Sequence, residues 1–374
     1  GAKVVLGGPE PPYYAEEYLA RGADVVVIGE GEIGTEELLQ ELARRGPHDV
    51  AHVPGIVFRN GDGEVVRTAP RPMIPDLDTL PMPDREAIDI AKYTRVWRDH
   101  HGRSSVSLIC ARGCPFHCDW CSHSVYGETH RRLSPGRVAD EVEGIVERYR
   151  PDQLWYADDV FTIKPSWVFA YAAELERRGL RLPFECISRA DRLNEEIIRT
   201  LARMGCYRLW MGSESGSQRI LDAMRRGVRV EAVQAMTRLC QRYGIEVGMF
   251  IMVGYEGEKE RDLAATVEHL KRTNPDLLLT TVAYPIKGTG YYGKVEKRLL
   301  ARAGWESRTD RDLTVAGRHS RRYYEHAMRW MVGQVTFHKQ MRSGGKDPVR
   351  VAKSAANIVR GRIGMALTSR EVER

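Results

Sequence analysis

One cysteine-rich stretch, Ser105-Val-Ser-Leu-Ile-Cys110-Ala-Arg-Gly-Cys114-Pro-Phe-His-Cys118-Asp-Trp-Cys121, determines how the rest of the sequence is interpreted. It begins as a predicted strand and continues into a loop in which Cys114, Cys118 and Cys121 have the spacing C-x3-C-x2-C. Three thiolates this close together can ligate three irons of a [4Fe–4S] cube, because iron–sulfur clusters select soft cysteine ligands. The fourth iron would then have no protein ligand, so it could bind a small molecule and pass it an electron.

A structural zinc site is the alternative for the same loop. Such a site usually takes four ligands from two knuckles, and no second C-x2-C or H-x3-H pair follows in the sequence. Cys110, His117 or His123 could supply a fourth ligand, so spacing alone leaves zinc open. The other three cysteines fall in strand and helix patterns and are predicted to be packed core thiols: Cys186, Cys206 and Cys240.

Strands and helices alternate regularly from Ser105 to about Tyr284. The predicted strands are Ser105–Ile109, Gln153–Ala157, Phe184–Ser188, Tyr207–Met211, Glu246–Val253 and Leu277–Ala283. Amphipathic helices lie between them; one begins at Ser134-Pro135 and another ends at Gly205. Six βα repeats imply a parallel sheet, and right-handed crossovers give either a doubly wound sheet or a barrel. Periodicity alone leaves that choice open.

The first 50 residues contain two predicted βα units, each with a Gly-rich turn after its strand. The first strand ends in Gly7-Gly8-Pro9, ahead of a helix around residues 14–21. The second covers residues 24–28 and ends in Gly29-Glu30-Gly31-Glu32, ahead of a helix from Thr35. Such turns are where ligands meet backbone N–H groups in parallel sheets, although tight turns need glycine in any case.

A hairpin and a proline-rich linker are predicted next. Ile56-Val57-Phe58 and Val65-Val66 flank the turn Asn60-Gly61-Asp62-Gly63, and five prolines between residues 70 and 83 favour an extended segment. We therefore expect four parts: residues 1–50, the hairpin and linker 51–103, the alternating region 104–300 and a C-terminal region 301–374.

Composition limits the classes of protein. The 374 residues are 42% hydrophobic and 29% charged, which suits packed globular domains and excludes disorder or collagen. No stretch has the ~20 apolar residues that a membrane span needs. Seven cysteines, four of them within residues 110–121, are typical of a ligand cluster in a reducing compartment, so we expect a cytoplasmic protein.

The net charge of +6 arises in the C-terminal region, which carries 16 Lys and Arg against 7 Asp and Glu. Two amphipathic helices are predicted there. The first has its apolar face at Tyr323, Ala327, Trp330 and Met331, and the second at Val349, Val351, Ala355, Ile358 and Val359. A solvated helical extension is the first interpretation; an anionic substrate, an acidic partner or peripheral contact with a membrane surface is the alternative. No Lys/Arg run is long enough to indicate nucleic acid.

The cysteine spacing, with Trp120 before the last cysteine and after the first strand of a six-fold βα pattern, resembles the signature of the radical S-adenosylmethionine (SAM) superfamily. That resemblance implies a partial (β/α)6 barrel and a [4Fe–4S] cluster whose open iron is chelated by SAM. Reductive cleavage of SAM would yield methionine and a 5′-deoxyadenosyl radical that abstracts hydrogen from a substrate. Cys110 would be an extra, non-ligating thiol.

The resemblance also implies SAM-binding residues at the ends of later strands. These are Trp120, Asp158, Asp159, Ser188, Arg189, Glu214, Ser215, Ile251 and Val253. The acidic pair would hold the SAM amino group, Arg189 would lie near its carboxylate and ribose, and Glu214 would accept from ribose hydroxyls or the SAM nitrogen. Each of these assignments has a structural alternative. Asp158 and Asp159 could be an acid pair at a helix N-terminus, Arg189 could be a surface arginine, and Ser217 could simply cap a helix.

Within the superfamily, the N-terminal turns and the linker resemble the cobalamin-binding class, which includes the anaerobic magnesium-protoporphyrin monomethyl ester cyclase, hopanoid-modifying enzymes and P-methylases. Gly7, Gly8, Gly29 and Glu30 would then contribute to the cobalamin site. The chain begins at Gly1 in mid-strand and matches only the C-terminal part of the Rossmann-like domain. We expect an N-terminal truncation, with cobalamin bound by the full-length protein and weakly or not at all by this chain.

The function expected from this resemblance is cobalamin-linked methyl transfer or oxidative cyclisation on a small hydrophobic or anionic substrate, with a flavodoxin or ferredoxin as electron donor. A methylthiotransferase would need a second N-terminal cysteine cluster, and residues 1–102 contain no cysteine. From a different class, a zinc-stabilised, non-catalytic binding protein could dock on an acidic partner through its basic tail. An inactive homologue is the third alternative.

Overall fold

The computed structural model describes residues 2–301 and 303–374 and divides into two compact units. The first, called the N-terminal unit below, comprises residues 1–80, 112–132 and 286–294. The second, the barrel unit, comprises residues 81–111, 133–285 and 295–374. The units are therefore not successive segments of the chain, and the cysteine loop belongs to the N-terminal unit.

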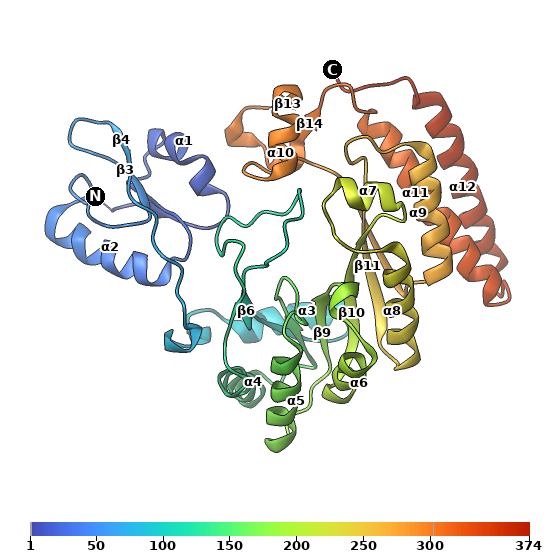
Figure 1. The fold of residues 1–374 in the computed structure, drawn as a ribbon, viewed down its shortest axis with the longest axis horizontal. Coiled ribbons are helices and arrows are strands. Elements are labelled where there is room, and N and C mark those ends of the chain that lie inside the picture. The colour runs from blue at the N-terminus through green and yellow to red at the C-terminus, as the bar shows by residue number, and fades with distance from the viewer. Residues whose placement is uncertain (1, 302) are drawn as a thin grey trace. The chain divides into compact units, whose positions relative to one another are not determined.

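The barrel unit is built on six parallel strands, in the order β12-β11-β10-β9-β8-β5. Figure 1 labels three of them, β9, β10 and β11. Their bounds are β5 Ser105–Leu108, β8 Gln153–Tyr156, β9 Phe184–Ser188, β10 Cys206–Glu214, β11 Glu246–Val253 and β12 Leu277–Val282. Each strand lies beside the next one along the chain, whereas a doubly wound sheet reverses direction at a switch point. The order thus confirms the partial (β/α)6 barrel.

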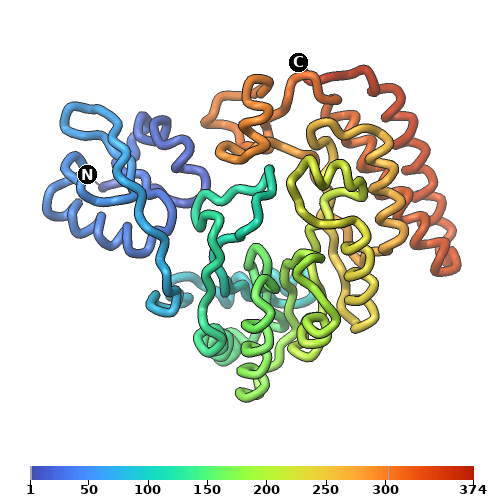
Figure 2. Tube along the Cα trace, in the orientation of Figure 1, coloured from blue at the N-terminus to red at the C-terminus, as the bar shows by residue number. Residues whose placement is uncertain are grey.

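Helices cover the outer face of this sheet, as the trace in Figure 2 shows. They are α4 Pro135–Tyr149, α5 Pro165–Arg177, α6 Glu195–Met204, α8 Val230–Arg242 and α9 Glu260–Thr273. Their ends follow the sequence signals: Ser134 accepts a hydrogen bond from the backbone N–H of Arg137, and Asn194 accepts one from Ile197. Gly205 ends α6 at φ +105°, a conformation that favours glycine. Further elements are α3 Ile90–His101, α7 Gln218–Ala223, α10 Gly290–Val295, β13 Leu299–Ala301 and β14 Leu313–Val315.

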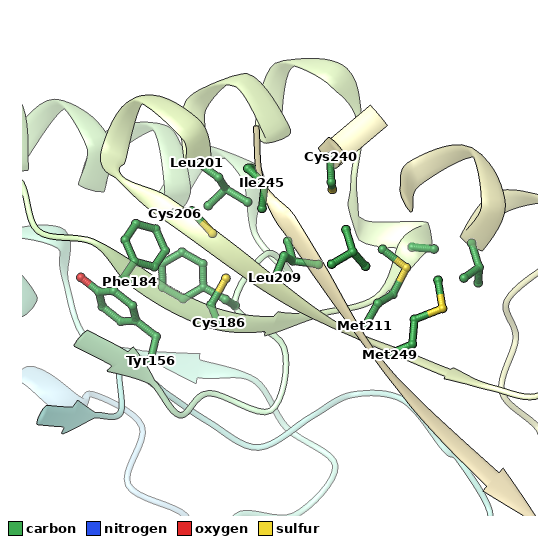
Figure 3. Close-up of a cluster of buried hydrophobic side chains, with 14 of the residues drawn as sticks. Tyr156, Phe184, Cys186, Leu201, Cys206, Leu209, Met211, Cys240, Ile245 and Met249 are labelled. Carbon is green, nitrogen blue, oxygen red and sulfur yellow. The ribbon is translucent and has the colours of Figure 1, made fainter. Parts of the chain in front are cut away.

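The barrel core lies between the sheet and these helices (Figure 3). Tyr156 and Phe184 pack edge to face with their ring centroids 5.0 Å apart. Cys186, Cys206 and Cys240 are buried in the same core, as predicted. Burial raises the pKa of the Cys240 thiol to about 12, so this cysteine stays protonated and serves packing.

The N-terminal unit contains a four-stranded sheet in the order β1-β2-β3-β4. Its elements are β1 Val5–Leu6, α1 Ala15–Ala20, β2 Val25–Val27, α2 Glu32–Arg45, β3 Ile56–Arg59 and β4 Val65–Arg67. β1 and β2 are parallel, and the predicted hairpin β3–β4 continues the same sheet in antiparallel sense. α2 begins three residues before the predicted start at Thr35, because Gly31 takes the N-cap position and Glu32 suits the first turn. The cysteine loop lies between β6 Ala111–Arg112 and β7 Arg131–Arg132, which pair with each other.

Two long helices, α11 Arg321–Arg342 and α12 Pro348–Thr368, form the C-terminal part of the barrel unit, and α11 packs on α9. The predicted apolar face of α12 is wrong at Val349 and Val359, which are 76% and 55% exposed. Glycines form the packed face instead: a Cβ on Gly361 would lie 2.6 Å from the backbone of Trp330. Close helix contact favours small residues over branched ones, which hydrophobicity patterns do not reveal. Among the described residues, no helix is long and apolar enough to cross a bilayer.

Candidate functional site

The cysteine loop carries three of the predicted ligand cysteines: Cys114 and Cys118 are buried and Cys121 is exposed. The backbone N–H of Cys121 donates to the carbonyl of Cys118 at 3.0 Å, which makes a turn between these two cysteines. Gly113 has φ +81°, and a Cβ there would lie 2.3 Å from the carbonyl oxygen of Thr129, so the loop requires glycine. No group of three or more His, Cys, Asp or Glu side chains in the described ranges forms a preassembled metal site. The donor chemistry nevertheless fits an iron–sulfur cluster, because three cysteines lie within eight residues of one loop.

Glu30 holds both ends of this loop within the N-terminal unit. Its buried carboxylate accepts from Arg112 at 2.8 Å, from Arg131 at 2.7 Å and from the backbone N–H of Ile74 at 2.8 Å. Burial opposes ionisation of Glu30, but the hydrogen bonds from Arg112, Ile74 and Arg131 outweigh it and lower its pKa. The structure therefore places this predicted cofactor residue in the framework of the loop.

A second attachment involves Asp119, which lies inside the cysteine loop. Its backbone carbonyl accepts from the N–H of Tyr291 at 2.7 Å, and its buried carboxylate pairs with Lys294. Gly288, in the same segment, packs so closely on Tyr13 that a Cβ would lie 2.2 Å from the ring. The turn after the sixth strand thus helps to fix the cysteine loop.

Within the barrel unit, Asp158 lies at the carboxyl end of β8 and is fully buried. Its carboxylate accepts from the backbone N–H groups of Cys110 at 2.6 Å and Ala111 at 3.1 Å. Asp158 therefore fixes the backbone where the chain leaves β5 for the cysteine loop. The neighbouring Asp159 is exposed at the same strand end.

Arg189, Glu214 and Arg226 form a buried charged cluster at the carboxyl ends of β9 and β10. Arg189 donates to Asp191 at 2.9 Å and to the backbone carbonyl of Arg226 at 2.8 Å, while Arg226 donates to the carbonyl of Gly212 at 2.9 Å. Sequence reasoning missed Arg226. Its signal was weak: an arginine pair after a short helix, followed by Gly227. Two guanidinium groups and one carboxylate give this end of the sheet the donors and acceptor that a zwitterionic ligand needs.

Glu214 has an unusual backbone and an unusual charge state. It is a non-glycine residue at φ +60°, and such conformations gather at functional sites. Burial raises the pKa of its carboxyl to about 7, against the opposing influence of Arg226 and Arg189. No hydrogen bond to this carboxyl occurs among the described residues. Its oxygens are thus free to accept from a ligand.

Helix α9 supports the Glu214 segment from behind. Ser213 contacts His269 Nε2 at 2.9 Å, and the backbone N–H of Gly216 donates to Thr266 at 3.0 Å. Burial lowers the pKa of His269 to about 4, so the ring is neutral and acts as a hydrogen-bonding support. Ser217 occupies the N-cap position of α7 but makes no capping bond; its hydroxyl donates to Asp262 at 2.7 Å.

The remaining predicted site residues differ in their surroundings. Ser188 is buried with its hydroxyl 2.5 Å from that of Thr162, and Ser215 lies 3.2 Å from Thr266. Ile251 and Val253 belong to the hydrophobic core, so an adenine ring beside β11 would meet backbone rather than these side chains. Trp120 is half-buried in the cysteine loop. Gly8 has φ +112° and nothing within 4 Å of a Cβ position, whereas Gly7 lies against Val27 and Gly29 against Val125.

Glu258 follows β11 and is not among the predicted site residues. One carboxyl oxygen accepts from the backbone N–H of Gly254 at 2.5 Å, and the other is buried with no hydrogen-bond partner among the described residues. Burial raises the pKa of this carboxyl to about 8, so the group is largely protonated at neutral pH.

Residues 108–270 match the family model described as the radical SAM superfamily, so this part of the chain is a radical SAM domain. Among curated relatives, the chain is 27% identical to an uncharacterized methyltransferase of Pyrococcus horikoshii, over 84% of this chain and 68% of the relative. It is 25% identical to the anaerobic magnesium-protoporphyrin IX monomethyl ester cyclase of Synechocystis sp., over 79% of this chain and 58% of the relative. The chain thus spans about three fifths to two thirds of these proteins.

A solved structure shares the fold. The radical SAM methyltransferase TsrM from Kitasatospora setae, determined with cobalamin and a [4Fe–4S] cluster bound, superposes with a TM-score of 0.67 at 19% identity. The match covers 81% of this chain and 61% of TsrM. The predicted family and fold class are confirmed.

Proposed function

We propose that this chain belongs to an enzyme that cleaves SAM reductively at a [4Fe–4S] cluster. One observation carries the proposal: a loop with cysteines at C-x3-C-x2-C spacing directly follows β5 of a barrel whose later strands end in a buried Arg–Glu cluster. Parallel α/β barrels place their functional groups at the carboxyl ends of the strands.

Cys114, Cys118 and Cys121 would ligate three irons, and Asp158 and Glu30 would fix the backbone that carries them. A bound cluster supplies the electron that converts SAM to methionine and a 5′-deoxyadenosyl radical. Arg189 attracts the SAM carboxylate, and Asp159 accepts from the SAM ammonium at the neighbouring strand end. Glu214 in its ionised form accepts from ribose hydroxyls or the ammonium group.

We infer that the complete enzyme links this radical chemistry to cobalamin, in methyl transfer or in oxidative cyclisation of a small hydrophobic or anionic substrate. The relatives named above support this, as one is a cyclase and TsrM was solved with cobalamin. The fit in this chain is partial: the turns at Gly7, Gly8 and Gly29 can approach a ligand with backbone, while Glu30 is engaged by Arg112 and Arg131. A cytoplasmic location and a flavodoxin or ferredoxin as electron donor complete the proposal.

The test compares Cys118→Ala with Cys110→Ala after anaerobic reconstitution with iron and sulfide. We expect wild type and Cys110→Ala to retain a cluster and to release 5′-deoxyadenosine or S-adenosylhomocysteine when dithionite and SAM are added. Cys118→Ala should lose the cluster absorbance and both products. A well-loaded wild-type cluster that yields neither product would contradict the proposal, and one bound zinc with no iron or sulfide would favour the zinc-stabilised alternative.

A further inference from the structure

A cavity of 440 Å³ lies within the barrel unit, beside the edge strand β12. Its walls come from β12, the segment 303–314 and the first turns of α11. Volumes of about 300–1,000 Å³ are typical of sites that enclose a small molecule. Tyr284, which lines the cavity, follows the carboxyl end of β12, on the side of the sheet where barrels carry functional groups. Size and position are therefore those of a ligand site.

Four arginines and three carboxylates line this cavity: Arg308, Arg311, Arg318 and Arg321, with Asp312, Glu325 and Glu373. The carboxylates are engaged by neighbouring groups. Asp312 accepts from the backbone N–H of Thr309 at 2.8 Å, and this bond lowers its pKa. Arg321 lies 3.4 Å from Glu325, and its backbone N–H donates to Glu373 at 2.8 Å. The guanidinium groups of Arg308 and Arg311, by contrast, have neither an ion pair nor a hydrogen bond in the described part of the chain.

Arg318 lines the cavity and is held by several hydrogen bonds. Its guanidinium donates to the backbone carbonyls of Ala283 and Gly254, which follow β12 and β11, and to Thr314 Oγ1 at 3.2 Å. Its Nε is buried with no hydrogen-bond partner among the described residues. Buried polar groups in folded proteins nearly always have partners, so an orphaned donor indicates a missing acceptor such as water or a ligand oxygen.

The cavity also offers surface for an organic body. The Arg311 guanidinium lies 5.7 Å from the centroid of the Tyr284 ring, so stacking holds its donors over an aromatic face. Val282, Leu313 and Met328 provide apolar wall. A ligand with an anionic head and an apolar or aromatic portion would satisfy both features.

We propose that this cavity binds the phosphoryl or phosphonyl group of the substrate. The guanidinium groups of Arg308 and Arg311 carry two positive charges, which match the charge of about −2 on such a group at neutral pH. Each planar guanidinium can donate two parallel hydrogen bonds to its oxygens. The identification of the ligand as substrate rests on the proposed function; the presence of an organic-anion site does not.

Isothermal titration of the reconstituted full chain tests the inference, with phenyl phosphate as probe, benzoate as a monoanionic comparison and benzyl alcohol as a neutral one. We expect saturable binding of phenyl phosphate, about tenfold weaker binding of benzoate and none of benzyl alcohol. The double variant Arg308→Gln/Arg311→Gln should weaken phenyl phosphate at least about tenfold, and Arg311→Lys should restore only part of the loss. Arg329→Gln, on the exposed surface of α11 outside the cavity, is the matched control and should leave binding unchanged.

Absence of saturable binding to wild type would overturn the inference, as would equal affinity of wild type and the double variant. Arg308 and Arg311 both line the cavity, and a thermal melt will show that the variants fold. Failure of the proposed function is measured separately, as the absence of 5′-deoxyadenosine from wild type with SAM and dithionite. That result would leave the anion affinities interpretable.

Discussion

Glu214 illustrates how its surroundings set the charge state of a single residue in the proposed SAM site. Its backbone is held at φ +60° and its carboxyl is buried beside two arginines, yet burial dominates and raises its pKa to about 7. A carboxyl that is half protonated near neutral pH can adopt the charge that the ligand demands. Ionisation of this buried carboxyl lowers the stability of the folded protein.

The raised pKa of Glu214 predicts how folding stability depends on pH. Between about pH 4.5, the ordinary value for glutamate, and pH 7, folded Glu214 binds more protons than the unfolded chain, so its contribution to stability falls as pH rises. The full effect is about 3 kcal/mol. Glu214→Gln should therefore gain stability relative to wild type between pH 5 and pH 8, measured as urea unfolding free energy.

The difference between wild type and variant isolates Glu214, because Glu258 titrates in both proteins. Glu176→Gln, an exposed substitution on α5, is the control and should track wild type at both pH values. A Glu214→Gln protein whose stability runs parallel to wild type across this range would show that the carboxyl is not perturbed.

At the level of elements, the segment that follows β10 can pack closely on α9 because Gly216 has no side chain. A Cβ on Gly216 would lie 2.5 Å from His269 Cβ and 2.6 Å from the backbone of Thr266. Backbone cannot yield as a flexible side chain can, so Gly216→Ala must push the Glu214 segment away from its support.

We expect Gly216→Ala to lower the free energy of unfolding by about 1–3 kcal/mol and to weaken SAM binding, measured by urea titration and equilibrium dialysis. Gly144→Ala is the matched control: Gly144 lies inside α4 with nothing within 4 Å of its Cβ position. This change should raise stability by up to about 1 kcal/mol. Equal effects of the two substitutions would refute the close-approach argument.

Strands and helix starts followed from sequence where local chemistry decides them. The predicted bounds of β9 and β11 agree with the structure, Ser134 caps the helix that it was expected to begin, and Gly205 follows the helix that it was expected to end. Predictions failed where tertiary contacts decide. Ser217 occupies a cap position but donates to Asp262, and α12 packs through glycine rather than through Val359.

At the level of the whole molecule, the cysteine loop could be found in the sequence, but the framework around it could not. The thiol spacing is local, whereas Glu30 reaches residues more than 80 positions away in the chain. Arg226 was missed for the same reason, since its role depends on meeting Arg189 and Gly212 from other elements. Long-range pairing of charged residues leaves no periodic signal.

Glu30→Ala should release the cysteine loop, because Arg112 and Arg131 lose a buried partner. Breaking a buried ion pair costs about 3–5 kcal/mol. We expect faster tryptic cleavage within residues 112–132 and poorer iron incorporation during reconstitution. Glu16→Ala, on the exposed side of α1, is the control. Cleavage of this segment at the wild-type rate would mean that Glu30 does not hold the loop.

The pairing of Asp119 with Lys294 can form only after both residues have been translated. The two residues are 175 positions apart. At about 5–20 residues per second, a ribosome takes roughly 10–35 seconds to pass from one to the other. During that interval the nascent chain carries three cysteines whose final anchor has not yet been translated. If the loop binds the cluster proposed above, the complete loop framework is available for that cluster only after translation of the barrel.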